Sequence, residues 1–144
     1  MNFFFDRCVP PRLCDIVKAA EGNSPKSDVV EHLNESFADD TVDIAWIREI
    51  GQRDPKPVVI SGDGRILKRP DEANALKEQD LTFFCLDSGW VESPFWDAAW
   101  RFLKLWPEIV SVAAKCREPK IFRVSFGKSL KIEEYAVTKN LRLK

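Results

Sequence analysis

The sequence predicts an α/β fold in which helices cover both faces of an open, mostly parallel sheet. Short apolar segments typical of strands alternate with longer segments whose apolar residues recur at helical spacing. The segment at residues 57–60 is a β-branched run between turn formers, as expected of a strand buried on both faces. The chain has 144 residues, 44% of them hydrophobic, which is enough for one core.

The first half of the chain alternates predicted strands and helices. The first helix is expected after the two prolines at positions 10 and 11 and should end at Gly22. In the second helix, Ile44, Ile47 and Ile50 recur at helical spacing, and Gly51 ends the pattern. The predicted elements are strand 2–5, helix 12–20, strand 29–33, helix 42–50 and strand 57–60.

The second half continues the alternation. Pro70, followed by acids in the first turn, predicts the start of a helix, and Pro107 should kink an aromatic-rich helix or start a new one. The chain from residue 128 is basic and amphipathic, so we expect one domain over residues 1–127 and a weakly ordered tail over 128–144. The predicted elements are helix 70–79, strand 81–86, helical segments 94–106 and 107–115, and strand 121–126.

The composition excludes several classes of protein. Twenty-two basic and 23 acidic residues give a net charge of -1, so binding to a polyanion would need a local basic patch. The apolar run at residues 3–5 is too short for a signal peptide or a membrane span, and we expect a cytoplasmic protein without a membrane partner. The four cysteines form no C-x-x-C pair, and with His32 alone they match no zinc spacing, so buried thiols are expected.

Three aspartates are candidates for a common site. Asp6 directly follows the first predicted strand, and Asp63 follows the third, in a Ser-Gly-Asp-Gly loop. Asp43 lies in the first turn of the helix before that third strand. Ligands of open parallel sheets bind outside the carboxyl ends of the strands, so the three carboxylates could converge there. Because clustered carboxylates repel one another, a bound Mg²⁺ or Mn²⁺ is the simplest explanation for such a set.

The same segments carry a resemblance to a known family. Residues 3–7 (FFFDR), 43–47 (DIAWI), 58–66 (VVISGDGRI) and 70–72 (PDE) occur in the order and spacing typical of that family. Over residues 2–90, the chain resembles the PIN-like domains of the VapC-related toxin ribonucleases. The resemblance implies a PIN-like three-layer α/β/α sandwich with a central, mostly parallel sheet of four or five strands.

The resemblance also implies a function. It implies a metal-dependent endoribonuclease with Asp6, Asp43 and Asp63 at the family's acidic positions, and Glu72 as a possible fourth acid. A metal-activated water would attack the phosphodiester bond of the RNA substrate and leave a 5′-phosphate and a 3′-hydroxyl. An additional acid from the acidic loop is left open; the candidates are Glu35, Asp39 and Asp40.

Basic residues next to these acids are candidates for phosphate binding. Arg7, Arg65 and Lys68 each lie near one of the acids in the sequence and would form the local patch that the net charge does not provide. The arginines could instead form salt bridges that hold the carboxylates in place.

Partners follow from the resemblance and from the aromatic residues. The family context implies a cognate antitoxin that covers the acidic crevice. The aromatic helices between residues 94 and 115 could form a homodimer face. Tryptophans there could also stack on unpaired bases, although aromatic residues at helical spacing more often belong to a core.

Two alternative functions remain open at this stage. A non-catalytic PIN-like binding module would keep the fold without a metal. A phosphoacceptor receiver domain would explain an Asp after the third strand and Lys128 after the last one. A receiver domain needs an acidic pair after its first strand, however, and here Arg7 follows Asp6. Each aspartate also has an ordinary explanation as a turn former or a first-turn helix residue.

Overall fold

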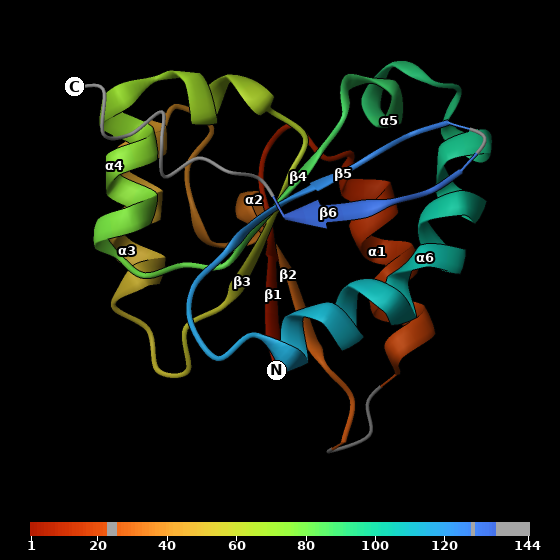
Figure 1. Cartoon of the computed structure of the whole chain (residues 1–144), viewed down its shortest axis with the longest axis horizontal. Helices are drawn as coiled ribbons and strands as arrows, with labels where there is room; N and C mark the ends of the chain where they lie inside the picture. Colours follow the sequence, from red (N-terminus) through yellow and green to blue (C-terminus); the bar gives the residue numbers. More distant parts are fainter. Residues whose placement is uncertain (23–25, 128, 135–144) are drawn as a thin grey trace.

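The structure is a computed structural model and describes residues 1–22, 26–127 and 129–134. Figure 1 shows the arrangement of its elements. In chain order these are β1 (Asn2–Phe5), α1 (Pro11–Glu21), β2 (Val29–His32), α2 (Leu33–Ser36), α3 (Asp43–Gly51), β3 (Val58–Ser61), the 3-10 helix η1 (Gly64–Lys68), α4 (Pro70–Glu78), β4 (Phe83–Leu86), α5 (Ser88–Glu92), α6 (Phe95–Lys115), β5 (Ile121–Val124) and β6 (Ile132–Glu134).

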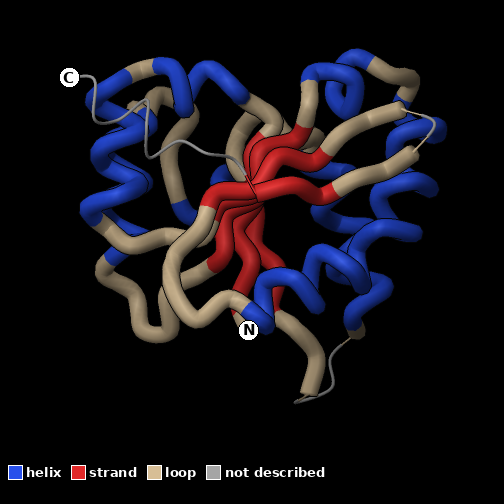
Figure 2. The backbone as a smooth tube through the Cα atoms, in the orientation of Figure 1, coloured by secondary structure: helices blue, strands red, loops and turns tan. Residues whose placement is uncertain are grey.

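A single twisted sheet forms the centre of the molecule (Figure 2). Its strand order is β2-β1-β3-β4-β5-β6. The first five of these are joined by parallel pairing, and β6 is antiparallel to β5. The chain places β2 on one side of β1 and β3 on the other, so the strand order reverses between β1 and β3. The carboxyl ends of these two strands therefore flank the crevice where ligands bind in such sheets.

The predicted α/β class with a mostly parallel sheet is confirmed, but the number of strands is not. The structure has six strands in place of four or five, because residues 132–134 pair with β5. Ser125 donates its backbone N–H to the Lys131 carbonyl at 2.8 Å, and Ile132 packs against the core. Residues 132–134, expected in a weakly ordered tail, thus form the last strand of the sheet. Lys128 and residues 135–144, which complete that expected tail, lie outside the described residues.

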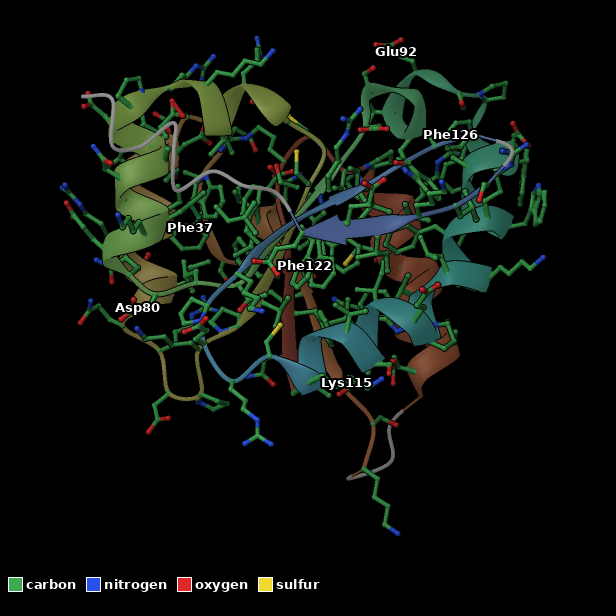
Figure 3. The ribbon with its side chains drawn as sticks, in the orientation of Figure 1. Phe37, Asp80, Glu92, Lys115, Phe122 and Phe126 are labelled. Atoms are coloured by element: carbon green, nitrogen blue, oxygen red, sulfur yellow. The ribbon has the colours of Figure 1, made fainter. Side chains whose placement is uncertain are left out.

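Helices cover both faces of the sheet and create two apolar cores. Successive side chains of a strand point to opposite faces. Phe3 and Phe5 accordingly lie in the core beneath α1 and α6, while Phe4 lies in the core beneath α3 and α4. Figure 3 shows Phe37 on the side of α3 and α4, where it packs against the second core. None of the helices in the described ranges is both long and apolar enough to cross a bilayer.

Short elements account for most differences from the predicted secondary structure. Leu33, expected in a strand, begins α2 instead, because the side chain of His32 accepts the Asn34 N–H and Glu35 accepts the His32 N–H in a capping box. The helices η1 and α5 were also not predicted, since five residues are too few to show helical periodicity. Pro107 does not divide α6, which is continuous and changes direction along its length (Figure 1).

Candidate active site

Asp6 is a buried carboxylate at the carboxyl end of β1. Its backbone N–H donates to the Ile60 carbonyl at 2.9 Å, which extends the pairing of β1 with β3 by one residue. Oδ1 accepts the backbone N–H groups of Cys8 at 3.0 Å and Gly62 at 3.3 Å, and Oδ2 accepts the Ser61 hydroxyl. Burial raises the pKa of Asp6 to about 6, even though these three hydrogen bonds favour the charged form.

Asp63 is linked to Asp6 through one hydroxyl group. Ser61 donates to Asp6, and its Oγ accepts the backbone N–H of Asp63 at 3.1 Å. Oδ1 of Asp63 also accepts two bonds from Arg65, one from the backbone N–H at 3.0 Å and one from Nε at 2.9 Å. Burial alone would raise the pKa of Asp63, but the bonds from Arg65 outweigh it, so the pKa is lowered.

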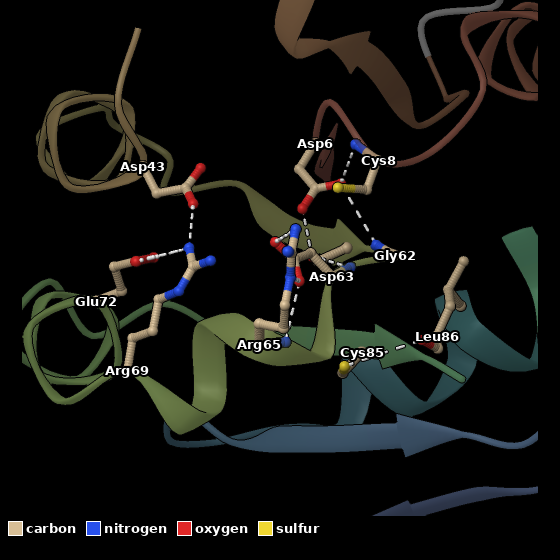
Figure 4. Close-up of polar contacts among 11 residues, drawn as sticks. Asp6, Cys8, Asp43, Gly62, Asp63, Arg65, Arg69, Glu72, Cys85 and Leu86 are labelled. Atoms are coloured by element: carbon tan, nitrogen blue, oxygen red, sulfur yellow. Dashed lines mark hydrogen bonds and ion pairs between the residues drawn. The ribbon is translucent and has the colours of Figure 1, made fainter. Parts of the chain in front are cut away.

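Asp43 and Glu72 are joined by one arginine. Asp43 is the first residue of α3, and its Oδ1 accepts the Trp46 Nε1–H at 2.9 Å. Arg69 lies between the two acids, with Nη1 3.8 Å from Asp43 Oδ2 and 3.1 Å from Glu72 Oε1 (Figure 4). Burial raises the pKa of Glu72, and the negative charge of Asp43 adds to this effect, whereas the bond from Arg69 opposes it.

The three predicted aspartates lie at the same edge of the sheet but form two groups. Asp6 is grouped with Asp63 and Arg65, and Asp43 with Arg69 and Glu72. Asp43 contributes to the raised pKa of Asp6, and all three carboxylates raise the pKa of the Cys8 thiol, to about 11, although burial is the larger cause there. The expected single three-carboxylate cluster is not formed. In the part of the chain that the structure describes, no three acidic, histidine or cysteine side chains are close enough together to surround a metal ion. Instead, Arg65 is ion-paired with Asp63, and Arg69 is ion-paired with Asp43.

The donor set nevertheless fits a hard divalent cation. Carboxylate oxygens are the ligands that Mg²⁺ and Mn²⁺ prefer. Burial and the charge of Asp43 disfavour the charged form of Asp6, and a cation beside its carboxylate would remove this penalty. The Arg65 side chain is 70% exposed, so its ion pair with Asp63 is open to solvent. Asp6, Asp43 and Asp63 therefore supply suitable oxygens, but they could hold one ion together only after Arg65 and Arg69 leave the carboxylates and the three side chains draw closer.

The three predicted phosphate-binding residues have different surroundings. Arg65 and Lys68 line a cavity of about 810 Å³ together with Asp63. Arg7 donates instead to two backbone carbonyls, at 3.0 Å to Thr41 and 3.4 Å to Ala38. The Arg7 side chain thereby ties the loop after β1 to the loop before α3, which helps to position Asp43.

The three additional acids of the acidic loop are not brought to the site. Glu35 forms an ion pair with Lys18 at 2.5 Å and accepts the His32 N–H at 2.7 Å. These contacts outweigh the effect of burial and lower the pKa of Glu35. Asp39 and Asp40 are exposed in the loop before α3.

The same cavity is lined by residues that are not among the predicted site residues. Asp87 directly follows β4, and its Oδ1 lies 2.7 Å from Nε of Arg123 on β5. Both residues line the cavity, as does Glu92 of α5. Asp87 could have been found from the sequence, since it follows the predicted strand 81–86 directly, as Asp6 follows the first strand. Arg123 could not, because it lies on a strand and only the pairing of β4 with β5 brings it to Asp87.

Comparison with known proteins identifies the family. No curated protein and no solved structure matches the chain. A family model described as a PIN like domain matches residues 1–88, which contain Asp6, Asp43, Asp63 and Asp87. The match ends before Lys128, on which the receiver alternative depended, and that residue lies outside the described ranges. Since the match covers 88 of the 144 residues, the chain belongs to the PIN-like domain family.

Proposed function

We propose that this chain is a metal-dependent endoribonuclease that hydrolyses RNA phosphodiester bonds at the carboxyl edge of its sheet. One observation carries the proposal: buried Asp6 is linked through Ser61 to Asp63, which opens onto a cavity lined by cationic side chains. Membership in the PIN-like family supports the same reading, because nucleases are common among PIN domains.

The acids would hold the metal ion. Asp6, Asp43 and Asp63 are the proposed ligands, and Asp87 lines the same cavity as Asp63. The chemistry that a bound Mg²⁺ or Mn²⁺ supplies is a water of lowered pKa and neutralisation of charge on the phosphate. The chain itself orients Asp6 with three hydrogen bonds, so the position of this carboxylate does not depend on the metal.

Cationic residues would position the RNA. Arg65, Lys68 and Arg123 line the cavity, and a guanidinium group can form two parallel hydrogen bonds to one phosphate. Attack by water rather than by the ribose 2′-hydroxyl would leave a 5′-phosphate and a 3′-hydroxyl.

The proposal extends to the biological role of the nuclease. We infer a toxin of a toxin–antitoxin pair, acting in the cytoplasm and blocked by a cognate antitoxin that covers the acidic crevice. The ion pairs of Arg65 and Arg69 support this inference, since they demonstrate that a guanidinium group fits against these acids. An antitoxin arginine could bind in the same way.

A metal-free RNA-binding module is the second candidate function. The absence of a preformed three-acid group among the described residues favours it. Such a module would bind RNA equally well with EDTA and with Mg²⁺ and would leave the RNA uncut.

The test is cleavage of a 5′-labelled structured RNA pool with Mg²⁺, with Mn²⁺ and with EDTA. Metal-dependent cutting by the wild-type chain that is lost in Asp6→Asn and in Asp63→Asn supports the nuclease. Asp71→Asn is the matched control, because Asp71 is an exposed acid beside Glu72 on α4 and should cut at the wild-type rate. If the chain binds RNA but does not cut it with either metal, the nuclease proposal is wrong and the RNA-binding module becomes the better account.

A further inference from the structure

Two tryptophans of α6 are exposed, which sets them apart from the other three. Trp46, Trp90 and Trp106 are buried in the cores. Trp96 is 76% exposed and Trp100 is 55% exposed. They are one helical turn apart, so both indoles lie on the same face of the helix.

Each exposed indole contacts the side chain next to it in the sequence. The ring of Phe95 contacts Trp96 edge-on, with centroids 5.5 Å apart. The guanidinium of Arg101 lies 5.5 Å from the centroid of Trp100, and Arg101 itself donates to the Gly127 carbonyl at 3.0 Å. Each indole thus has an aromatic or cationic neighbour and still presents more than half of its surface to solvent.

Two cations lie beside the exposed indoles, and one of them, Arg101, is ion-paired with Asp97 at 3.4 Å. Trp100, Arg101 and Lys104 line a hollow of about 370 Å³. Lys104 is exposed and lies one turn beyond Trp100, so it continues the row of Trp96 and Trp100 along the helix. Glu108 also lines the hollow but lies at the far end of this row.

Helix α6 begins close to a helix that borders the candidate active site. Val91 and Glu92 of α5 line the cavity that contains Asp63, and α6 begins three residues after Glu92. Arg101 packs over Phe126 at 4.8 Å, and Figure 3 shows Glu92 and Phe126 at the same end of the molecule. A chain that leaves the cavity along α5 would therefore pass toward the start of α6.

The charged residues on this face favour a polynucleotide over a second copy of the chain. A stable protein interface buries about 800 Å² per partner around an apolar centre that is poor in charge. Here Val91 is the sole large exposed aliphatic residue of α5 and α6, and the indoles alternate with Asp97, Arg101 and Lys104. Indole faces beside cations are the surface that binds unpaired bases and their phosphates.

We propose that Trp96 and Trp100 form a stacking platform for unpaired bases of single-stranded RNA, with Lys104 contacting the phosphates. This inference rests on the proposed RNA-directed function and narrows the substrate class to RNA with an unpaired segment that extends beyond the cleaved bond.

The experiment measures binding of a labelled single-stranded RNA of about 12 nucleotides by fluorescence anisotropy in EDTA, where cleavage cannot interfere. The variants are Trp96→Ala, Trp100→Ala, the double variant and Lys104→Gln. We expect the Kd to rise at least about fivefold for each indole removed, and Lys104→Gln to lower the salt dependence of binding by about one ion. Val29→Ala removes a 58% exposed apolar side chain on β2 and is the matched control.

Wild-type affinity in the double variant, or no binding of the RNA by the wild-type chain, would overturn the platform. A dimeric wild-type chain that becomes monomeric in the double variant, as measured by light scattering, would assign the face to self-association instead. Circular dichroism confirms that each variant is folded. Because binding is measured without metal, loss of the platform and failure of the nuclease are separate results: a platform without cleavage leaves the inference standing for an RNA-binding module.

Discussion

Arg65 donates its Nε–H to Oδ1 of Asp63 at 2.9 Å, and its side chain is 70% exposed while that of Asp63 is 9% exposed. The Asp63 carboxylate is thus buried, whereas the Arg65 side chain that pairs with it is largely exposed to solvent. Arg69 stands in the same relation to Glu72, with side-chain exposures of 46% and 13%. A divalent cation that binds these acids would have to displace the guanidinium groups.

Replacing Arg65 by Gln should therefore strengthen metal binding. Arg65→Gln removes the cation that competes for Asp63, and we expect the Kd for Mn²⁺, measured by calorimetry, to fall severalfold. Arg48→Gln on the outer face of α3 is the control and should bind Mn²⁺ as the wild type does. Unchanged or weaker Mn²⁺ binding in Arg65→Gln would contradict the competition.

The buried carboxylate of Asp6 should destabilise the protein above pH 6. Its pKa is raised to about 6 in the folded state, whereas an unfolded Asp titrates near 4. The stability that protonated Asp6 contributes is present below pH ~4 and is lost as the pH rises through about 6. Asp6→Asn should thus raise the free energy of unfolding at pH 7.5, by at most about 3 kcal/mol.

Thermal unfolding in EDTA at pH 4.5 and at pH 7.5 checks this prediction. The gain in Tm from Asp6→Asn should be present at pH 7.5 and largely absent at pH 4.5. The same variant should lose cleavage activity, as expected where a site is kept at the cost of stability. An Asp6→Asn protein that is less stable than wild type at pH 7.5 would show that the hydrogen bonds to Asp6 dominate over its burial.

Gly62 should be intolerant of any side chain. A Cβ at this position would lie 2.9 Å from Val91 Cγ1 and 3.1 Å from the Cys8 carbonyl oxygen. Gly62→Ala must shift the loop after β3 away from the loop after β1, and with it the N–H that Gly62 donates to Asp6. We expect a loss of about 1–3 kcal/mol in stability together with a fall in kcat.

Gly64→Ala is the control for this change. Its Cβ would lie 3.7 Å from Cys85 Sγ, an ordinary contact, although Gly64 lines the same cavity. Denaturant unfolding and cleavage assays compare the stability and the kcat of the two variants. Equal effects of the two substitutions would mean that the packing of Gly62 against Cys8 and Val91 has no special role.

Asp43 and Glu72 should differ in their effects on cleavage. Asp43 contributes to the raised pKa of buried Asp6, whereas Glu72 is paired with Arg69 and interacts with Asp43. We expect Asp43→Asn to lower kcat at least about 100-fold, the order for a lost electrostatic contact in a transition state, and Glu72→Gln to lower it less than about tenfold. Single-turnover kinetics measure both, and equal losses would make Glu72 a fourth metal ligand.

Some of these features could be read from the sequence because they depend on residues that are close together in the chain. The β-branched run at residues 58–60 and the apolar run at residues 3–5 predicted strands, and the family resemblance predicted the sheet that they form. The acids that follow β1 and β3 were predicted as site residues because a parallel sheet brings the ends of its strands to one edge. Residues 132–134 escaped prediction, since three residues become a strand only when β5 is beside them.

Only the tertiary structure decided which charges are paired and which aromatic side chains are free. Arg69 bridges Asp43 and Glu72, and Arg123 reaches Asp87, because packing of α3 against α4 and of β4 against β5 brings distant residues together. Trp106 and Trp100 belong to the same aromatic-rich segment of the sequence, yet the first lies against Phe3 and the second faces solvent. Local sequence determines which elements form, whereas burial and electrostatic pairing depend on distances through space that no local pattern contains.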